Sequence, residues 1–311
     1  MAAAVLKRGE AVVWLPPRSA GERSLGSDPS LLLMTAEPGS ASVSLRRASL
    51  ETLPALRSVR LVFDARDVSL HMARLPSLPA ARLQRALPNL LEDQVLQDAQ
   101  QCAWALSPEP GAERLVAAID RQWLETVCGA FERRGIRLSA AWPAQSLRFA
   151  QRTQGLTLVG VGQSLVMIAD AADGLGLGAG PDIESRRQAV ETAMALGGDR
   201  QARGLTILAQ DESWERAARE ASEARGVNAR LLPLSVPVAA SIDLLASRRG
   251  GSLQRKFAEF DSRAWRLPGV LALATILIAV AGLNLHWWVL RTEQAALRAR
   301  VDAKIAADPD W

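Results

Sequence analysis

The run from Pro268 to Leu290 constrains this chain more than any other part of it, and it reads PGVLALATILIAVAGLNLHWWVL. It holds 23 residues and no Asp, Glu, Lys or Arg. At about 1.5 Å per residue a helix of this length extends about 34 Å, and the hydrocarbon core of a bilayer is about 30 Å thick. We therefore predict one transmembrane helix over 268–290, in preference to the alternative of a buried core helix in a soluble protein.

Aromatic and basic side chains stand at both ends of this run. Trp side chains favour the headgroup level of a bilayer, and Arg side chains near a helix end can extend to it. We expect membrane lipid to be contacted by five interfacial anchors, which are Trp265, Arg266, Trp287, Trp288 and Arg291.

The flanking charges predict the orientation of the span. The first residues, MAAAVLKRGEAVVWLPPRSAGE, contain neither a long apolar stretch nor a cleavage site, so they do not read as a secretory signal. Six basic residues precede the span within 20 positions and four follow it, and basic residues favour the cytoplasmic side. We expect a single-pass protein with a cytoplasmic N-terminus. These residues are Arg248, Arg249, Arg255, Lys256, Arg263 and Arg266 before it, and Arg291, Arg298, Arg300 and Lys304 after it.

Composition narrows the classes of partner and of chemistry. The formal net charge is +4, and much of the basic excess lies beside the predicted span, where it can meet anionic lipid. No basic stripe carries interleaved aromatic residues, which argues against nucleic acid as a partner. Cys102 and Cys128 lack metal-ligand spacing and stand among apolar residues, so we predict two buried, reduced thiols.

The region before the span reads as α/β with mixed sheets, in two lobes. Expected strands and helices alternate in both halves, and the second lobe begins near Gly155. We predict a first lobe over 1–154, a second over 155–247, and a basic linker over 248–267. The expected strands are 11–15, 31–34, 41–45, 59–63, 68–73, 102–106, 115–119, 138–142, 156–161, 165–169, 205–209 and 229–232, and the expected helices are 80–99, 121–134, a helix starting at Pro143, 183–196 and 213–224.

Two glycine-rich runs resemble phosphate cradles. Gly160-Val161-Gly162 follows an expected strand, and glycines alternate from Gly174 to Gly180. A phosphate site needs converging backbone N–H groups, often with a Lys, and no Lys lies near either run. We favour a hairpin turn for the first run and a flexible loop for the second. Asp64 and Asp67 could act as paired carboxylates, but we favour the alternative that turn propensity alone places them in a hairpin between 59–63 and 68–73.

Catalytic motifs are not found. There is neither a phosphate-binding G-x-x-x-x-G-K-[ST] sequence nor a G-x-S-x-G nucleophile elbow. His71 is the single histidine outside the predicted span, and its alternating position indicates a partly exposed strand residue. We expect no enzyme activity, no cofactor and no metal.

Several segments in series resemble the L component of type II secretion systems. They are Val59–Pro76 (VRLVFDARDVSLHMARLP), Leu87–Asp93 (LPNLLED), Ala118–Leu124 (AIDRQWL) and Asp243–Leu245 before a basic linker and a late span. The resemblance implies an actin-like (ribonuclease H-like) cytoplasmic domain of two lobes, anchored in the bacterial inner membrane. It also implies a non-enzymatic scaffold, with the cytoplasmic secretion ATPase, the M component and the inner-membrane platform protein as partners, and a homodimer is expected.

Departures from the family pattern qualify this expectation. Actin-like ATPases hold nucleotide through Asp-containing glycine loops, whereas LTLVGVGQS has Val at the Asp position and AVVWLPP also lacks the Asp. The family usually continues into a periplasmic ferredoxin-like domain, and we expect only a short helical stub over 291–311. The alternative function is a membrane-tethered actin-like ATPase or kinase relative, which would bind ATP with magnesium. A membrane sensor and a type IV pilus scaffold are further alternatives.

Overall fold

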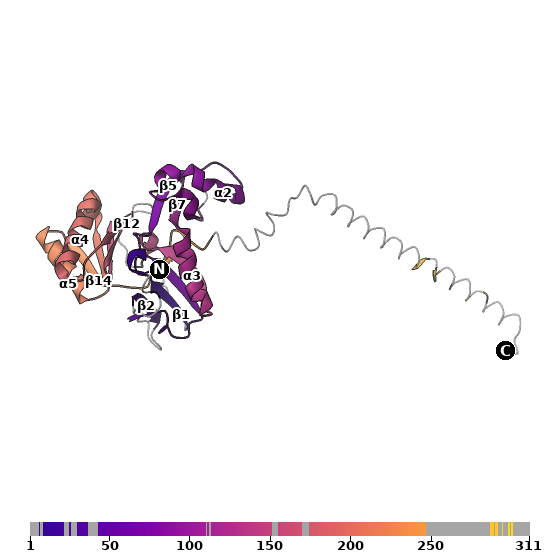
Figure 1. The fold of residues 1–311 in the computed structure, drawn as a ribbon, viewed down its shortest axis with the longest axis horizontal. Helices are drawn as coiled ribbons and strands as arrows, with labels where there is room; N and C mark the ends of the chain where they lie inside the picture. Colours follow the sequence, from indigo (N-terminus) through magenta and orange to yellow (C-terminus); the bar gives the residue numbers. More distant parts are fainter. Residues whose placement is uncertain are drawn as a thin grey trace. The chain divides into compact units, whose positions relative to one another are not determined.

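The computed structural model describes residues 9–21, 30–36, 43–109, 111, 113–150, 155–169 and 174–246, with Leu6, Leu25 and positions 287, 288, 290, 291, 294, 298 and 300. By compactness the chain divides into two units, Met1–Arg249 and Gly250–Trp311. The strands and helices of the first unit are drawn in Figure 1.

The first five-stranded sheet has the order β3-β2-β1-β4-β8. β1 pairs antiparallel with β2 and parallel with β4, and β4 pairs parallel with β8. The sheet is therefore mixed, as the sequence predicts. Its strands are β1 (Glu10–Trp14), β2 (Leu31–Ala36), β3 (Val43–Ala48), β4 (Ser58–Phe63) and β8 (Arg137–Pro143).

The second five-stranded sheet repeats this arrangement with the order β12-β11-β10-β13-β14. Its central strand β10 pairs antiparallel with β11 and parallel with β13. The succession antiparallel, antiparallel, parallel, parallel is thus the same in both sheets. The strands are β10 (Leu156–Val161), β11 (Ser164–Ile168), β12 (Gly174–Gly178), β13 (Leu205–Ala209) and β14 (Ala229–Pro233).

A smaller sheet of order β5-β7-β6 stands between β4 and β8 in the chain. One of its faces packs beneath α2 through a cluster that includes Leu87, Trp104 and Val116. Its elements are β5 (Val68–Arg74), α2 (Ala80–Leu90), the 3-10 turns η1 (Glu92–Gln94) and η2 (Ala99–Gln101), β6 (Cys102–Leu106) and β7 (Glu113–Asp120).

Three helices begin at an Asp N-cap, which explains where they start. Asp120 accepts a bond from the Trp123 N–H at 2.8 Å, Asp182 from Ser185 at 2.8 Å, and Asp211 from Trp214 at 3.0 Å. The helices are α3 (Arg121–Arg133), α4 (Ile183–Gly197) and α5 (Glu212–Ala224). The remaining elements are α1 (Arg18–Gly21), η3 (Ala144–Ser146), β9 (Leu147–Arg148), η4 (Gly198–Arg203) and β15 (Ala239–Ala240).

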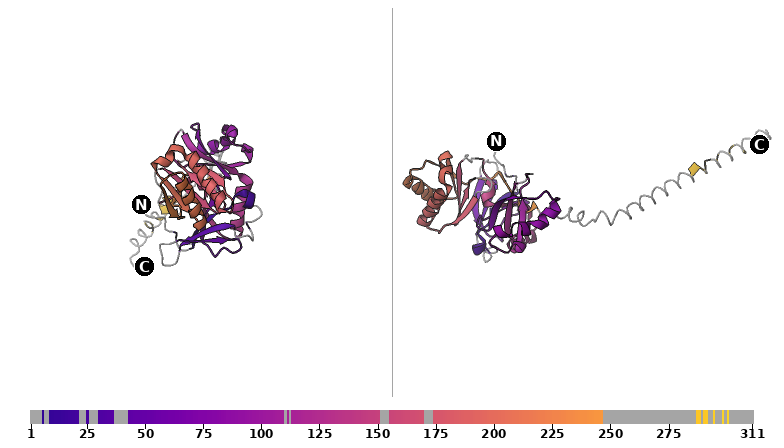
Figure 2. Two further views of the ribbon diagram at one scale, coloured as in Figure 1. Left: turned by 90° about the vertical axis from the view of Figure 1, so that its left-hand side faces the viewer. Right: turned by 90° about the horizontal axis from the view of Figure 1, so that it is seen from above.

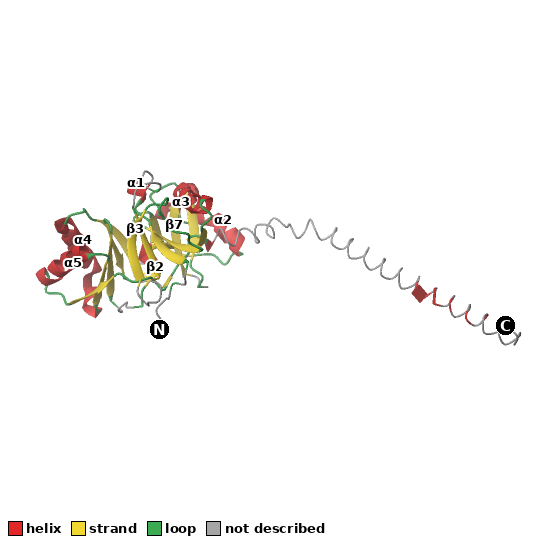
Figure 3. Ribbon diagram, turned by 90° about the horizontal axis from the view of Figure 1, so that it is seen from below, coloured by secondary structure: helices red, strands yellow, loops and turns green. Residues whose placement is uncertain are grey.

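The two large sheets pack face to face, with helices on their outer faces. Figure 3 shows strands between α4 and α5 on one side and α3 on the other, and Figure 2 (left) shows α4 and α5 in front of their sheet. Alternate residues of β1 divide between two cores: Ala11 and Val13 face α3, whereas Val12 and Trp14 face the second sheet. Val159, Val166 and Leu208 of the second sheet complete this inter-sheet core.

Several local predictions require correction. The expected helix over 80–99 ends at Leu90, because Pro88 lacks the N–H that would bond the Gln84 carbonyl, and the chain continues in 3-10 turns. The helix expected from Pro143 is only η3, where the buried Gln145 amide bonds Val68 O at 2.6 Å. β3 ends at Ala48, beyond the predicted 41–45, and residues 41 and 42 lie outside the described set.

Two predicted connections also differ from the structure. β4 and β5 form no hairpin, because β4 lies between β1 and β8 while β5 pairs with β7 in another sheet. The run from Gly174 is the strand β12 through Gly178, where we expected a flexible loop.

Candidate functional site

The turn between β4 and β5 joins the two large sheets through a polar cluster. Arg66 donates from Nε to Asp64 Oδ1 at 3.0 Å and from Nη2 to Ser164 Oγ at 2.5 Å. The Ser164 hydroxyl donates to Asp64 Oδ2. Asp64 is only 5% exposed, so its charge is compensated by Arg66 inside the protein. The predicted turn is confirmed by the bond from Asp67 N to Asp64 O, but the inter-sheet role was not predicted.

Asp67 lies in the same turn and bonds a different segment. Its Oδ2 accepts the Arg18 N–H at 2.8 Å, and the Arg18 guanidinium pairs with Asp120 at 2.8 Å. Burial raises the pKa of the Asp67 carboxyl to about 6, the bond from Arg18 N–H opposes this, and the charge of Asp64 adds to it. The two predicted carboxylates are therefore neighbours with separate partners rather than an acid–base pair on a shared substrate position.

The alternating glycines of β12 bring the second sheet against this turn. An added Cβ at Gly174 would stand 2.4 Å from Gln145 Cβ, and one at Gly176 would stand 2.7 Å from Ala65 Cβ. At Gly178 it would stand 3.0 Å from the Arg66 guanidinium. Since side chains alternate along a strand, this glycine face allows close backbone approach between the sheets. The pattern is explained by packing and not by a phosphate cradle.

The hairpin at Gly160–Gly162 is closed by the protein's own side chains. The register Val161 to Ser164 confirms the predicted turn at Gly162-Gln163, where Gly162 has a φ of +57°. The Gly162 N–H donates to Gln210 Oε1 at 2.6 Å, and Trp214 Nε1 donates to the Gly162 carbonyl at 3.1 Å. A phosphate-binding loop needs such N–H groups free for its ligand, so these residues do not fit a nucleotide phosphate.

Arg186 fills the space beside this hairpin. It pairs with Asp211 at 3.0 Å and stands 5.0 Å from the centre of the Trp214 ring. The same ring excludes a side chain at Gly160, where a Cβ would stand 2.5 Å from Trp214 Cδ2. Within the described residues, no group of three or more His, Cys, Asp or Glu side chains is arranged to hold a metal ion.

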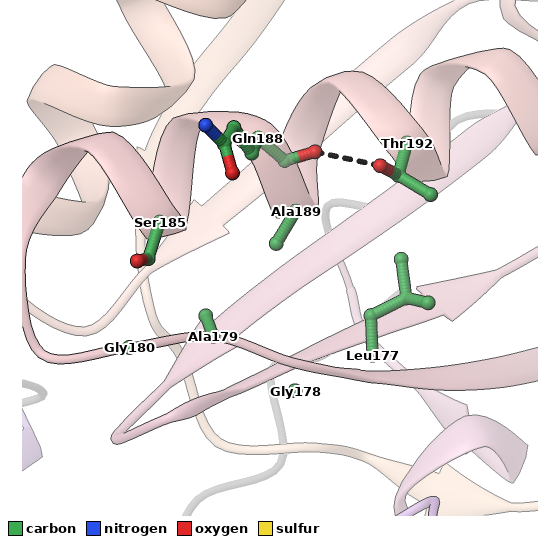
Figure 4. A pocket seen from close by; sticks show the side chains of 8 residues that line it. All are labelled: Leu177, Gly178, Ala179, Gly180, Ser185, Gln188, Ala189 and Thr192. Atoms are coloured by element: carbon green, nitrogen blue, oxygen red, sulfur yellow. Dashed lines mark hydrogen bonds between the residues drawn. The ribbon is translucent and has the colours of Figure 1, made fainter.

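A groove of about 380 Å³ lies between β12 and α4. In Figure 4 Leu177 and Ala179 point toward α4, and Ala189 of that helix points back toward them. Every lining side chain is uncharged; the residues are Leu177, Gly178, Ala179, Gly180, Ser185, Gln188, Ala189 and Thr192.

The segment after β14 returns to the first sheet. β15 pairs with β9, and Ile242, Leu244 and Leu245 are buried in the core beneath α3. Ala141 in β8 donates its N–H to Asp243 Oδ1 at 2.9 Å and accepts from Leu244 N at 2.8 Å. Residues 242–245, which precede the predicted linker, are therefore attached to β8 and to the core beneath α3.

The two cysteines and His71 lie in the environments that the sequence predicts. Both cysteines are buried thiols that form no disulfide, which confirms that prediction, and burial raises the pKa of the Cys102 thiol. His71 is partly buried in β5, which confirms its predicted position, and burial lowers its pKa.

The predicted span falls almost wholly outside the described residues. Pro268, Trp265 and Arg266 lie outside them, whereas Leu290 is described, as are the predicted anchors Trp287, Trp288 and Arg291. These described positions are helical and exposed, and the Arg291 guanidinium stands 4.6 Å from the Trp287 ring centre. Across the described part of the chain, we find no helix with the length and apolarity needed to cross a bilayer.

Comparison with known proteins addresses the resemblance. The family model described as Type II secretion system (T2SS), protein L, matches residues 34–178. Among curated proteins none matches the chain. A similar solved structure is the cytoplasmic domain of EpsL, an inner membrane component of the type II secretion system of Vibrio cholerae. Its sequence identity is 17% and its TM-score 0.49, over 73% of this chain and 84% of that chain.

A second similar structure is the PilM-PilN type IV pilus biogenesis complex, with 12% identity and a TM-score of 0.44 over 65% of this chain and 84% of that chain. The family match covers three of the segments that carry the resemblance, Val59–Pro76, Leu87–Asp93 and Ala118–Leu124, whereas Asp243–Leu245 lies outside it. Over residues 34–178 it confirms the resemblance to the protein L component of type II secretion systems.

Proposed function

We propose that this protein is a non-enzymatic inner-membrane scaffold of a type II secretion system. It recruits the cytoplasmic secretion ATPase to the membrane and links it to the M component and the inner-membrane platform protein. The observation that carries this proposal is the match of residues 34–178 to the protein L family. The mechanism is one of effective concentration, because a tethered ATPase meets its membrane partners as if within one molecule.

The arrangement of the sheets supports an actin-like, two-lobed cytoplasmic domain. Two mixed five-stranded sheets repeat one strand order, as expected of a duplicated lobe over 1–154 and 155–247. An actin-like ATPase holds nucleotide between its lobes, whereas here the facing sheets share a buried apolar core that includes Trp14, Met34 and Val166. The hairpin at Gly162, whose N–H is bonded by Gln210, also argues against a nucleotide phosphate site. Both features favour a scaffold over the alternative ATPase or kinase relative.

The proposed topology places residues 1–247 in the cytoplasm and a basic linker over 248–267 before a single span at 268–290. The stub over 291–311 then lies in the periplasm, and the protein pairs as a homodimer. Movements of the ATPase would pass to the span through Ile242–Leu245, because this segment attaches the linker to the core of the first lobe.

The test of recruitment removes the span and leaves the cytoplasmic part intact. A chain lacking 268–290 should still co-purify with the secretion ATPase, but membrane fractions of those cells should lose the ATPase. A matched control replaces 268–290 by an uncharged leucine-rich span of equal length, which should restore the membrane-bound ATPase. Unchanged membrane-bound ATPase after the deletion would contradict the proposal.

A further inference from the structure

The outer edge of β12 presents free main-chain groups at alternate residues. Ala179 N bonds Gln163 O, and Val161 and Ser164 flank the two-residue turn. Ala179 and Gln163 are therefore a hydrogen-bonded pair. In an antiparallel ladder, bonded pairs alternate with non-bonded pairs, so the N–H and C=O groups of Leu175 and Leu177 point to β11. Those of the three alternating glycines therefore point away from β11. Among the described residues, β11 is the single strand paired with β12.

This edge lacks the devices that normally protect an open sheet edge. Natural edges carry charged side chains, proline or bulges that prevent another strand from adding. The sequence from Gly174 through Gly180 has no charge and no proline, and its register with β11 is regular. By contrast, the edge strand β3 of the first sheet carries exposed Arg46 and Arg47. The difference marks β12 as an edge open to pairing.

The surroundings of the edge define what can pair with it. The β12–α4 groove runs along the side on which Leu175 and Leu177 project, and its lining is uncharged. Leu177 lines the groove, and Leu175, two residues earlier on the same face of β12, is 39% exposed. On the opposite side the buried Gln145 packs against Gly174, and its Oε1 has no hydrogen-bond donor.

A second copy of the chain does not suit this edge. Each copy carries Ala65, Arg66 and Gln145 directly over the glycine face of its own β12. Antiparallel self-pairing would set two first lobes on the same face of one joined sheet, with their edge strands only about 4.8 Å apart. A single extended segment brings no such bulk.

We propose that the β12 edge is a docking site for an extended, uncharged segment of a partner protein. The segment adds as a sixth strand, its main chain bonds the outward groups of the alternating glycines, and its alternate side chains enter the β12–α4 groove. This surface is additional to the scaffold role proposed above and does not depend on which secretion component binds elsewhere.

The test uses the full-length chain in mild detergent and a defined probe. The probe is a blocked nonapeptide in which valine alternates with threonine or serine. A control peptide carries proline at two adjacent central positions. In either register, one of these prolines then lacks the main-chain N–H that would bond β12. We expect saturable binding of the probe alone. Residue-resolved hydrogen exchange should slow roughly tenfold or more at Gly174, Gly176 and Gly178, with little change at Leu175 and Leu177, which already bond β11.

Matched variants test the location. Leu175→Lys places a charge on the edge, whereas Leu196→Lys changes another exposed leucine, on α4 outside the groove. The first should weaken probe binding roughly tenfold or more and the second should not. Should Leu175→Lys fail to fold, Gly178→Pro removes an outward N–H, and a Cβ at this position meets only Arg66 Nη1 within 4 Å.

Four results would overturn the proposal. They are absence of saturable binding, equal binding of the proline peptide, glycine amides already protected without a probe, and self-association that Leu175→Lys abolishes. The last result would identify a second copy as the occupant. Because the assay contains no secretion component, its failure leaves the membrane-recruitment test unaffected.

Discussion

The closeness of the two sheets at Gly176 makes a sharp prediction about stability. A Cβ at this position would stand 2.7 Å from Ala65 Cβ and 2.9 Å from backbone atoms of Ala65 and Arg66. Backbone atoms held in a packed turn cannot move aside at low cost, and overpacking of this kind costs about 1–3 kcal/mol. Replacing glycine in a strand recovers about 0.5–1 kcal/mol of chain entropy. We therefore expect Gly176→Ala to destabilise the protein by about 1–2 kcal/mol.

The matched control is Gly178→Ala, two residues along the same face of β12. There the added methyl meets a single side-chain atom, Arg66 Nη1 at 3.0 Å, and no backbone atom within 4 Å. This variant should stay within about 0.5 kcal/mol of the parent. Ala65→Gly combined with Gly176→Ala should recover part of the loss, because it removes the nearest contact atom.

Thermal unfolding followed by circular dichroism measures this difference. For a unit of this size, each kcal/mol corresponds to about 2–4 °C in Tm, so Gly176→Ala should melt several degrees below Gly178→Ala. If the two variants melt together, the close approach of β12 to the β4–β5 turn does not exist in solution. The inter-sheet packing argument would then be wrong.

Two further predictions concern the return segment and Asp67. Leu244→Ala should lower the free energy of unfolding by about 2–5 kcal/mol, since Leu244 is 2% exposed in the first-lobe core, whereas Leu90→Ala at a 44% exposed position should change it by less than about 0.5 kcal/mol. Equal urea midpoints for these two variants would contradict the attachment of the linker. The pKa of Asp67 is raised from 3.8 to about 6, so its contribution to stability is present at low pH and is lost as pH rises through about 6. At pH 7.5, Asp67→Asn should therefore have a free energy of unfolding about 1 kcal/mol above that of the parent, after allowance for partial solvent screening, and a higher urea midpoint. Near pH 4 the variant and the parent should have nearly equal urea midpoints. A parent protein that gains stability relative to Asp67→Asn as pH rises would refute the sign of this shift.

Local signals in the sequence were sufficient for most individual elements. Short apolar runs locate β1, β10 and β13, and amphipathic spacing locates α3. These predictions succeed because apolar runs and helix periodicity depend on neighbours within a few residues. The helix predicted over 80–99 is too long, because Pro88 lacks the N–H that would bond the Gln84 carbonyl and the helix ends at Leu90.

The candidate site was less accessible from the sequence. Asp64, Asp67 and the glycine runs stood out, but each was explained by local turn chemistry. Their partners are distant in the chain: Ser164 follows Asp64 by 100 residues, and Gly176 contacts Ala65. The sequence reveals the turn, but the packing of this turn against β12 depends on how the two sheets stack, which no local pattern encodes.

The amino-acid pattern was enough to establish an α/β chain with mixed sheets, to identify the resemblance to protein L, and to show that the common phosphate-binding and nucleophile motifs are missing from it, because these depend on residue type at short spacing. The meaning of the glycines and of Ile242–Leu245 came from the three-dimensional arrangement. A glycine in a strand is compatible with a loop, a ligand or a close backbone, and only the atoms opposite it distinguish them. In this protein those atoms belong to the facing lobe, which turns an apparent phosphate motif into the contact that holds two sheets together.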